Sequence, residues 1–211
     1  YDYYKTKNIL NYGVYNWDNE EVEYYYPKDE TYKDKTISMN FNFIYKINNT
    51  NSIILSIARG NKTGGINQSP NFPNNRYYET DTSNNFEISY KHLNDRFSFD
   101  INTFLINRQT PQLRLYVQHS SDPTSFDYAT FNANKMNSYG FELSTSYKIT
   151  ENVKLLNEFS FLNSKLSKFT FNNTTYGNRQ SAQSPKYQYQ ISLLFKTSEN
   201  TNIRLSKIYT D

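Results

Sequence analysis

The sequence predicts an all-β fold: an antiparallel up-and-down transmembrane β-barrel, present here as a partial barrel wall of about ten strands. Two observations lead to this prediction. Eight or more segments alternate apolar and polar residues over about ten positions each, which is the pattern of a strand with one apolar face. The connections between these segments are alternately very short and very long, as at the two ends of a membrane barrel.

Residues 36–47 show the alternation most clearly. One face of this segment is apolar, and it comprises Ile37, Met39, Phe41, Phe43 and Tyr45. The other face is polar, with Ser38, Asn40, Asn42 and Lys46, and only Ile44 breaks the period of two. After a turn at residues 48–51, the alternation resumes with Ile53, Leu55 and Ile57. These two segments predict a β-hairpin.

Three more segment pairs repeat this hairpin design. The first pair has Phe86, Ile88 and Tyr90 before a turn near Asn94 and Asp95, and Phe97, Phe99 and Ile101 after it. The second has Tyr139, Phe141, Leu143, Thr145 and Tyr147 before a turn at residues 150–152, then Val153, Leu155, Phe159 and Phe161. The third has Tyr187, Tyr189, Ile191, Leu193 and Phe195 before a turn at residues 198–200, then Ile203 and Leu205.

The long connections all fall on one side of the predicted wall. They cover residues 7–35, 61–84, 108–137 and 164–186, and the third contains a predicted extended piece at residues 113–117. A first strand is predicted at residues 1–6, and residues 96–118 read as one long strand broken near Pro111. Because outer-membrane barrels have short periplasmic turns, we expect the long loops outside the cell, where ligand contacts concentrate.

The composition fits a single sheet better than a large globular core. Mean hydropathy is −0.87 and only 36% of the 211 residues are hydrophobic, whereas aromatic residues reach 18%. Strands with one lipid-facing side need apolar residues at only half of their positions, and aromatics favour strands and membrane interfaces. The net charge of +3 gives no electrostatic reason to expect nucleic acid as a partner.

The sequence is interpreted as a fragment of a longer mature chain. It opens with Tyr1, carries no basic-then-apolar signal segment and ends at Asp211 without an aromatic last residue. An open sheet would leave unpaired strand edges in lipid, where each unsatisfied backbone group costs several kcal/mol. We therefore expect the wall to depend on strands outside this chain.

Four local patterns follow one another along residues 36–211. The first is Arg59-Gly60 followed by Gly64-Gly65-Ile66-Asn67. The second is residues 85–91, in which Glu87 precedes Ser89 and Lys91. The third is Asn132-Ala133 followed by Gly140-Phe141-Glu142, and the fourth is residues 177–179 followed by residues 184–187. Taken in this order, the four patterns resemble TonB-dependent outer-membrane receptors of the siderophore and iron-complex type, in which the position of Ile66 is usually aromatic.

This resemblance implies an importer. Residues 1–211 would be part of the barrel domain of a TonB-dependent receptor, and the plug domain and the last strands would be absent. The intact barrel would have 22 strands and a plugged lumen. The implied partners are a ferric siderophore or another scarce nutrient complex, outer-membrane lipid, and the TonB-ExbB-ExbD system, reached through the missing N-terminal part. The implied location is the bacterial outer membrane.

Cationic and phenolic side chains near the outer strand ends are the candidate ligand-binding residues. They are Arg59, Lys62, Arg76, Tyr77, Tyr78, Arg108 and Arg114. Guanidinium groups and phenols can hold an anionic, aromatic ferric chelate by charge-assisted hydrogen bonds and stacking. Any single one could instead belong to the interfacial aromatic girdle or contact lipid headgroups.

Glutamates on the polar strand faces have two interpretations. Glu87, Glu142 and Glu158 could steer a substrate, but a hydrogen-bonded lumen lining or contact with a plug is the favoured interpretation. His92 and His119 lack metal-ligand spacing, and the chain has no cysteine. We therefore expect no metal site and no cofactor, and the absence of any catalytic motif predicts a non-enzyme.

Two other functions remain open at the level of sequence. One is a passive porin-like nutrient channel, and the other is a soluble β-sandwich binding module. A sandwich predicts that Phe41, Phe99, Phe141 and Ile191 are buried between layers, whereas a barrel predicts that they form an exposed belt.

Overall fold

The computed structural model describes residues 2–16, 21–67, 75–118, 124, 126–171, 174–177, 179–181 and 184–211, with the backbone alone for residues 2–30, 117 and 179. Eight long strands form one antiparallel sheet in the order β17-β16-β12-β11-β8-β7-β4-β3, and short β15 pairs with β12. The long strands are β3 Met39–Lys46, β4 Asn51–Lys62, β7 Asp81–Leu93, β8 Phe97–Gln109, β11 Lys135–Thr150, β12 Val153–Leu166, β16 Tyr187–Ser198 and β17 Thr201–Thr210. None of the described residues belongs to a helix long and apolar enough to cross a membrane.

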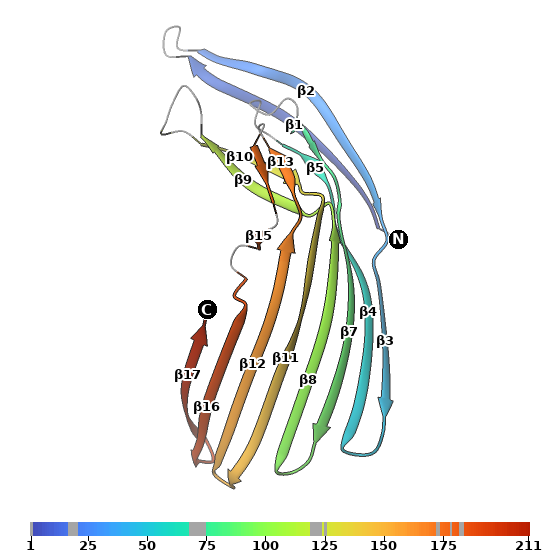
Figure 1. The fold of residues 1–211 in the computed structure, drawn as a ribbon. Coiled ribbons are helices and arrows are strands. Elements are labelled where there is room, and N and C mark those ends of the chain that lie inside the picture. Colours follow the sequence, from blue (N-terminus) through green and yellow to red (C-terminus); the bar gives the residue numbers. More distant parts are fainter. Residues whose placement is uncertain are drawn as a thin grey trace.

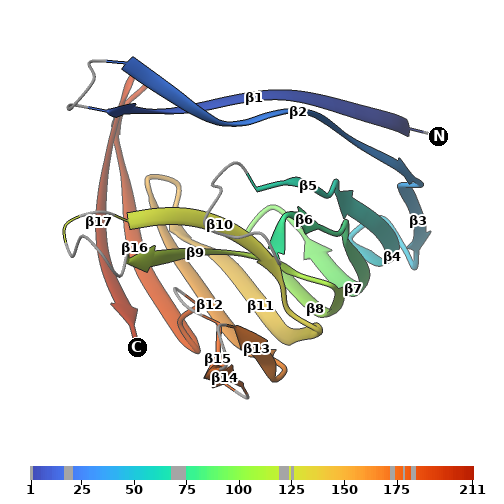
Figure 2. The same cartoon turned by 90° about the horizontal axis from the view of Figure 1, so that it is seen from above.

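The eight strands form a curved wall. Its short turns lie together at the lower end in Figure 1, and the remaining strands lie at or beyond the upper end. Seen from above, the wall is an arc that is open between β3 and β17 (Figure 2). The four predicted hairpins and the partial, unclosed barrel wall are therefore confirmed.

The register places apolar residues of all eight strands in one row. Residues opposite one another across the sheet are Tyr45, Ile53, Tyr90, Ile101, Leu143, Phe159, Tyr189 and Tyr209. The next row lies on the other face and is mostly polar: Lys46, Ser52, Lys91, Asp100, Ser144, Glu158, Gln190 and Ile208. Because successive side chains alternate between faces, the wall has one apolar and one polar surface.

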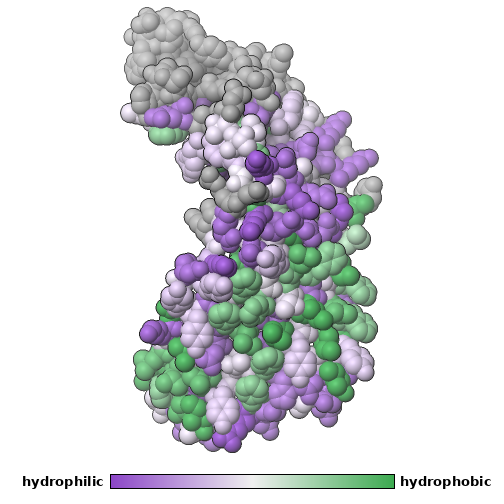
Figure 3. Space-filling model, in the orientation of Figure 1, coloured by the Kyte–Doolittle hydropathy of each residue, from purple (hydrophilic) through white to green (hydrophobic). Residues whose placement is uncertain are grey.

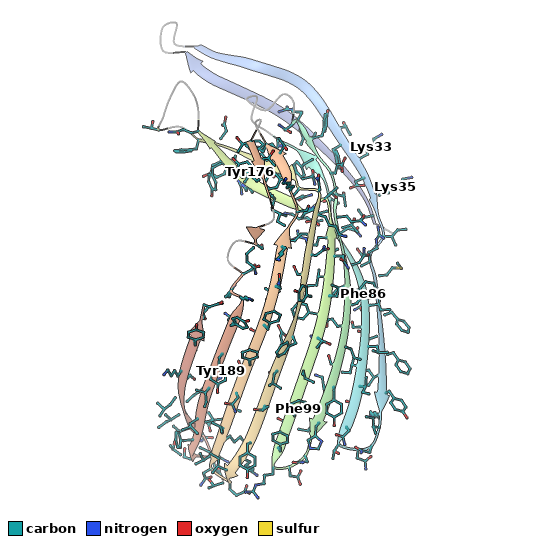
Figure 4. All side chains as sticks on the ribbon, viewed as in Figure 1. Lys33, Lys35, Phe86, Phe99, Tyr176 and Tyr189 are labelled. Atoms are coloured by element: carbon teal, nitrogen blue, oxygen red, sulfur yellow. The ribbon has the colours of Figure 1, made fainter. Side chains whose placement is uncertain are left out.

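The apolar surface has the height of a membrane band. Figure 3 shows hydrophobic side chains gathered over the lower part of the wall and hydrophilic ones above them, and Figure 4 labels Phe86, Phe99 and Tyr189 along this face. Outward apolar positions on β8 run from Phe97 to Leu105, about 27 Å of strand at roughly 3.4 Å per residue. That length is comparable with the apolar band of outer-membrane barrels once the strand tilt is included.

The four residues chosen to separate a barrel from a sandwich are not buried. Phe41 is 63% exposed, and Phe99, Phe141 and Ile191 are half-buried because neighbouring strands flank them within the sheet. No second layer covers the apolar face of the wall within the described parts of the chain. This arrangement excludes the soluble sandwich.

The first long connection is not a loop. β1 Asp2–Asn16 and β2 Glu21–Thr36 form a long antiparallel hairpin, so the strand predicted at residues 1–6 continues ten residues further. The prediction of a loop at residues 7–35 was wrong, because no apolar alternation marks these strands although their backbones pair along the whole hairpin. Figure 2 shows this hairpin crossing the open side of the arc.

The other long connections also contain strand pairs. β5 Gly65–Ile66 pairs with β6 Tyr77–Tyr78, β9 Gln112–Gln118 with β10 Phe126–Asn132, and β13 Phe169–Phe171 with β14 Thr174–Tyr176, while β15 covers Arg179–Gln180. The predicted break near Pro111 and the extended piece at residues 113–117 are both confirmed.

A small apolar cluster holds β9–β10 against β13–β14. Ala129, Phe131 and Phe171 are buried, and Leu115, Phe169 and Tyr176 pack around them. The rings of Phe131 and Phe171 lie 4.1 Å apart, centroid to centroid. We call the strands at or beyond the upper end of the wall (β1, β2, β5, β6, β9, β10, β13, β14 and β15) the loop layer. The described residues thus have their main buried cluster in this layer, because the wall itself is a single sheet.

Candidate functional site

The amide of Asn67 ties two connections together at the upper end of the wall. Its Nδ2 donates to the carbonyl oxygens of Thr130 (2.8 Å) and Asn75 (2.7 Å), and its Oδ1 accepts from the backbone N–H of Thr130 (2.7 Å). The side chain thereby pairs with the edge of β10 as another strand would. Asn67 is 4% exposed, so these bonds are shielded from water.

A second amide group fixes the base of the β9–β10 hairpin. Asn132 Oδ1 accepts from the backbone N–H of Glu79 (2.7 Å), and its Nδ2 donates to the carbonyls of Glu79 (3.0 Å) and Thr110 (2.8 Å). Gln112 Nε2 donates to the carbonyls of Thr63 and Glu79 at 2.8 and 3.0 Å. Asn67 and Asn132 belong to the first and third of the four local patterns in the sequence. Their amide groups therefore position the loop layer.

A buried ion pair stabilises the point where β8 leaves the wall. The carboxylate of Asp81, 3% exposed, accepts from the guanidinium of Arg108 and from the backbone N–H of Gln112 (3.2 Å). Thr110, between them in sequence, has φ of 50° and donates its hydroxyl to the carbonyl of Thr80 (2.6 Å). Arg108, one of the candidate ligand residues, thus has a structural partner in Asp81.

The exposed face of β9–β10 carries a cation stacked on aromatic rings. Arg114 Cζ lies 4.8 Å from the ring centroid of Tyr128, and the rings of Tyr128 and Tyr116 are 4.4 Å apart. Tyr116 is 66% exposed and Tyr128 48% exposed. The opposite face of the hairpin packs on the Phe131–Phe171 cluster, so these three residues, which we call the Arg114 platform, face away from it.

The other candidates do not form one cluster with Arg114. Arg59 follows Ile57 by two positions on β4, which places it on the apolar side of the wall, whereas Lys62 falls on the polar side. Arg76 donates to the carbonyl of Asn67 (2.6 Å). Tyr78 covers Gly65, and exposed Tyr77 borders a cleft near β10.

The three glutamates lie on the polar face of the wall, as the alternation predicts. Glu87 accepts a hydrogen bond from Asn85 Nδ2, and Glu158 lies 3.9 Å from the guanidinium of Arg204. Glu142 and Glu158 line a groove of about 390 Å³ with Ser144, Ser160, Gln188 and Gln190. The groove is thus a hydrogen-bonding surface with two carboxylates.

The described residues contain no group of three potential metal ligands from His, Cys, Asp and Glu. His92 lies in a hydrogen-bonded chain in which Nδ1 meets Asn51 Oδ1 (2.8 Å) and Nε2 meets Asn94 Nδ2 (2.9 Å). Asn51 Oδ1 also accepts from the Tyr90 hydroxyl, so His92 donates through Nδ1. His119 lies outside the described residues.

A family model described as TonB dependent receptor-like, beta-barrel matches residues 1–206. The chain belongs to this family. TonB-dependent receptors are outer-membrane proteins of Gram-negative bacteria, so the wall is part of an outer-membrane barrel, and the family comprises receptors and transporters, not enzymes. No curated protein is detectably similar in sequence.

Solved structures share the fold. The ferric yersiniabactin uptake receptor FyuA from Yersinia pestis is 16% identical with a TM-score of 0.63, and the match covers 86% of this chain and 27% of that one. The copper transporter OprC is 12% identical with a TM-score of 0.68, covering 92% and 30%. The alcaligin outer-membrane receptor FauA from Bordetella pertussis is 14% identical with a TM-score of 0.58, covering 90% and 32%. This chain therefore spans less than a third of each of them.

Sequence reasoning missed two members of the platform, Tyr116 and Tyr128. Both belong to strands of the loop layer, and only one of these strands was predicted. The sequence did contain one signal for the platform: Tyr116 follows Arg114 by two residues in the predicted extended piece at residues 113–117. Residues i and i+2 of a strand share a face, so the two side chains were expected on the same side.

Proposed function

We propose that this chain belongs to an outer-membrane receptor that binds a ferric siderophore or a similar scarce nutrient at its extracellular loops. Energy supplied through TonB then drives import. The Arg114 platform is the single observation that carries the proposal. It presents a guanidinium and two exposed phenol rings on the same side of the wall as all the long connections.

The chemistry of the platform suits an anionic ligand with aromatic groups. A guanidinium offers fixed N–H donors to anionic oxygens, and the rings of Tyr116 and Tyr128 offer stacking faces. Because the cation already stacks on Tyr128, the platform loses little side-chain entropy when a ligand binds. Names of the structural neighbours, among them a ferric yersiniabactin receptor and an alcaligin receptor, support iron complexes as the ligand class.

The remaining candidate residues enter the proposal with different roles. Tyr77 lies on β6 in the loop layer and Lys62 at the end of β4, where both can contact part of a ligand. Arg76 donates to a backbone carbonyl, Tyr78 covers Gly65, and Arg108 pairs with the Asp81 carboxylate. Arg59 lies on the lipid side of the wall by register. It therefore suits an anionic headgroup better than an imported ligand.

Uptake of radiolabelled iron by cells that produce the full-length receptor tests this function. We expect uptake of the cognate ferric chelate to stop when TonB is deleted, while binding to the cell surface persists. Arg114→Gln should weaken binding by about tenfold, or ~1.4 kcal/mol, whereas the control Arg59→Gln should leave binding unchanged. Undiminished uptake without TonB would instead indicate a passive porin-like channel.

A further inference from the structure

The lipid-side face of the wall changes from apolar to polar within one row, at the end that carries the long connections. The last apolar row comprises Phe41, Ile57, Phe86, Leu105 and Tyr139. The next row on the same face comprises Met39, Arg59, Asn84, Asn107, Asn137 and Lys165, and the row beyond it contains Asn61, Thr82, Gln109 and Lys135. Amides and cations therefore border the apolar surface directly.

Five exposed cations lie in or beyond these two polar rows. Arg59, Lys135 and Lys165 belong to the rows themselves. Lys33 and Lys35 on β2 are exposed, whereas the residues that alternate with them are half-buried or buried, and Figure 4 places both lysines above the apolar face of the wall. None of the five makes an ion pair with any described residue. We call these five residues the outer cation belt.

The carboxylates of the wall strands lie on the other face. By register, the residues on the lumen side include Asp81, Glu87, Asp100, Glu142 and Glu158. Within the described residues, the lipid side of β3, β4, β7, β8, β11 and β12 carries no aspartate or glutamate. The outer cation belt therefore presents uncompensated positive charge beside an apolar surface.

The position of the belt selects an anion that is attached to an apolar chain. Arg59 lies opposite Met39 and two positions beyond Ile57, so an anion at its guanidinium borders the acyl chains that cover the apolar surface. A lipid headgroup satisfies this geometry. Guanidinium and ammonium groups form short, charge-assisted hydrogen bonds with phosphate. The amides of the two polar rows add donors and acceptors that suit the hydroxyl and amide groups of a sugar headgroup.

We propose that the outer cation belt binds the phosphate groups of lipopolysaccharide directly, in place of the divalent cations that otherwise bridge neighbouring phosphates. A magnesium ion that joins a phosphate to a protein is usually held by a carboxylate, and neither polar row contains one. The belt lies at the end of the wall that we expect outside the cell, where lipopolysaccharide forms the leaflet. The inference concerns the lipid around the barrel, and it holds whichever ligand the receptor imports.

Native mass spectrometry of the full-length receptor in detergent measures its affinity for each lipid. Bisphosphorylated lipid A should bind more tightly than phosphatidylglycerol or the same lipid A without phosphates. Lys135 and Lys165 are diagonal neighbours on β11 and β12. Lys135→Gln with Lys165→Gln should weaken binding of bisphosphorylated lipid A by about tenfold and leave that of phosphate-free lipid A unchanged. The control Lys148→Gln with Lys154→Gln removes the same charge from the lumen side of the same strands, and it should alter neither affinity.

Magnesium dependence separates direct binding from a metal bridge. Wild-type binding of bisphosphorylated lipid A should persist in EDTA. Lys135→Glu with Lys165→Glu should lose binding in EDTA and regain it when magnesium chloride is added, a gain that misfolding cannot produce. Loss of wild-type binding in EDTA, equal affinity for lipid A with and without phosphates, or phosphatidylglycerol binding as tight as that of bisphosphorylated lipid A would each overturn the assignment. Binding that the two lysine-to-glutamine changes leave unaltered would overturn it as well.

Discussion

Gly140 shows how a single missing side chain permits the wall to form. A Cβ added there would lie 2.0 Å from the carbonyl oxygen of Phe161 on the adjacent strand and 2.9 Å from Cζ of Phe104. The ring of Phe104, opposite Gly140 in register, thus covers the space that a side chain would fill. Such a close approach of neighbouring backbone is a common reason for glycine within a strand.

Gly140→Ala should therefore destabilise the folded barrel by about 1–3 kcal/mol, because strand backbone must move to admit the methyl group. Urea unfolding of the full-length receptor in lipid vesicles measures the change. Gly60→Ala is the matched control, since nothing lies within 4 Å of a Cβ at position 60. Equal stability of the two variants would show that the strands do not pack as described at Gly140.

The contact between Asn67 and β10 should weaken when the side-chain nitrogen of Asn67 is replaced by oxygen. Asn67→Asp keeps the shape but replaces the Nδ2 donor with an oxygen that faces the carbonyls of Thr130 and Asn75. Leaving such buried groups unpaired costs about 1–3 kcal/mol each. We expect faster amide hydrogen exchange in residues 126–132, measured by mass spectrometry, and no such change in the control Asn84→Asp. Unchanged protection of β10 would exclude the tethering role.

The role of Asn67 could not be predicted from its position in the sequence. The Gly64-Gly65-Ile66-Asn67 motif was recognisable, but its partner Thr130 lies 63 residues away on a strand that was not predicted. Pairing between two connections depends on how both leave the wall. Local pattern contains no information on that geometry.

At the scale of elements, the alternation of apolar residues predicted the wall strands and missed most of the loop-layer strands. β7 and β8 alternate because one face meets lipid and the other the lumen. Above the apolar band both faces of a strand meet water or other loops, so pairing continues without a hydropathy signal. β1 and β2, with residues such as Lys33, Asp34 and Lys35, are the clearest example.

The ion pair of Asp81 and Arg108 should stabilise the junction of β7, β8 and β9. Arg108→Met leaves the buried carboxylate of Asp81 unpaired, which we expect to cost about 3 kcal/mol. Asp81→Asn should cost less, because the Arg108 side chain is 33% exposed, and the double variant should cost less than the sum of the two. Asp81→Asn, Arg108→Met and the double variant, compared by urea unfolding, form the test. If the loss of unfolding free energy in the double variant equals the sum of the two single losses, the two groups act independently.

The contact of β2 with the β5 segment should respond to alkaline pH. A Cβ on Gly64 would meet the Tyr32 hydroxyl, so that hydroxyl packs against the glycine, and burial, followed by the Asp34 carboxylate, raises the pKa of Tyr32 above 10.0. A raised pKa means that stability from the neutral phenol is fully present below pH 10 and is lost as pH rises through the folded-state pKa.

Ultraviolet difference titration of the wild type against Tyr32→Phe isolates this phenol. The midpoint for Tyr32 should lie above the ordinary value for tyrosine. A midpoint at or below that value would show that the hydroxyl is solvated and that β2 does not pack on Gly64.

At the scale of the whole molecule, the wall cannot remain an isolated open sheet in a membrane. Every described residue of the edge strands β3 and β17 is exposed. Outer backbone groups of such edges would cost several kcal/mol each in lipid, so we expect both edges to pair with further strands of the receptor. Cysteines placed in pairs across each edge and its neighbour should form crosslinks in the full-length receptor, and their failure to do so would contradict a closed barrel.

The orientation of the two faces is the central claim, and adjacent positions on one strand test it directly. Nitroxide labels are attached at Ile88→Cys and Ser89→Cys within the full-length receptor in lipid vesicles, and these 211 residues contribute no cysteine that would compete for the label. Electron paramagnetic resonance then measures how often each nitroxide label collides with oxygen, which concentrates in lipid, and with a water-soluble nickel chelate. The label at position 88 should collide with oxygen far more than with nickel, and the label at position 89 should lose this preference. A lipid signature at position 89 and not at position 88 would contradict the account.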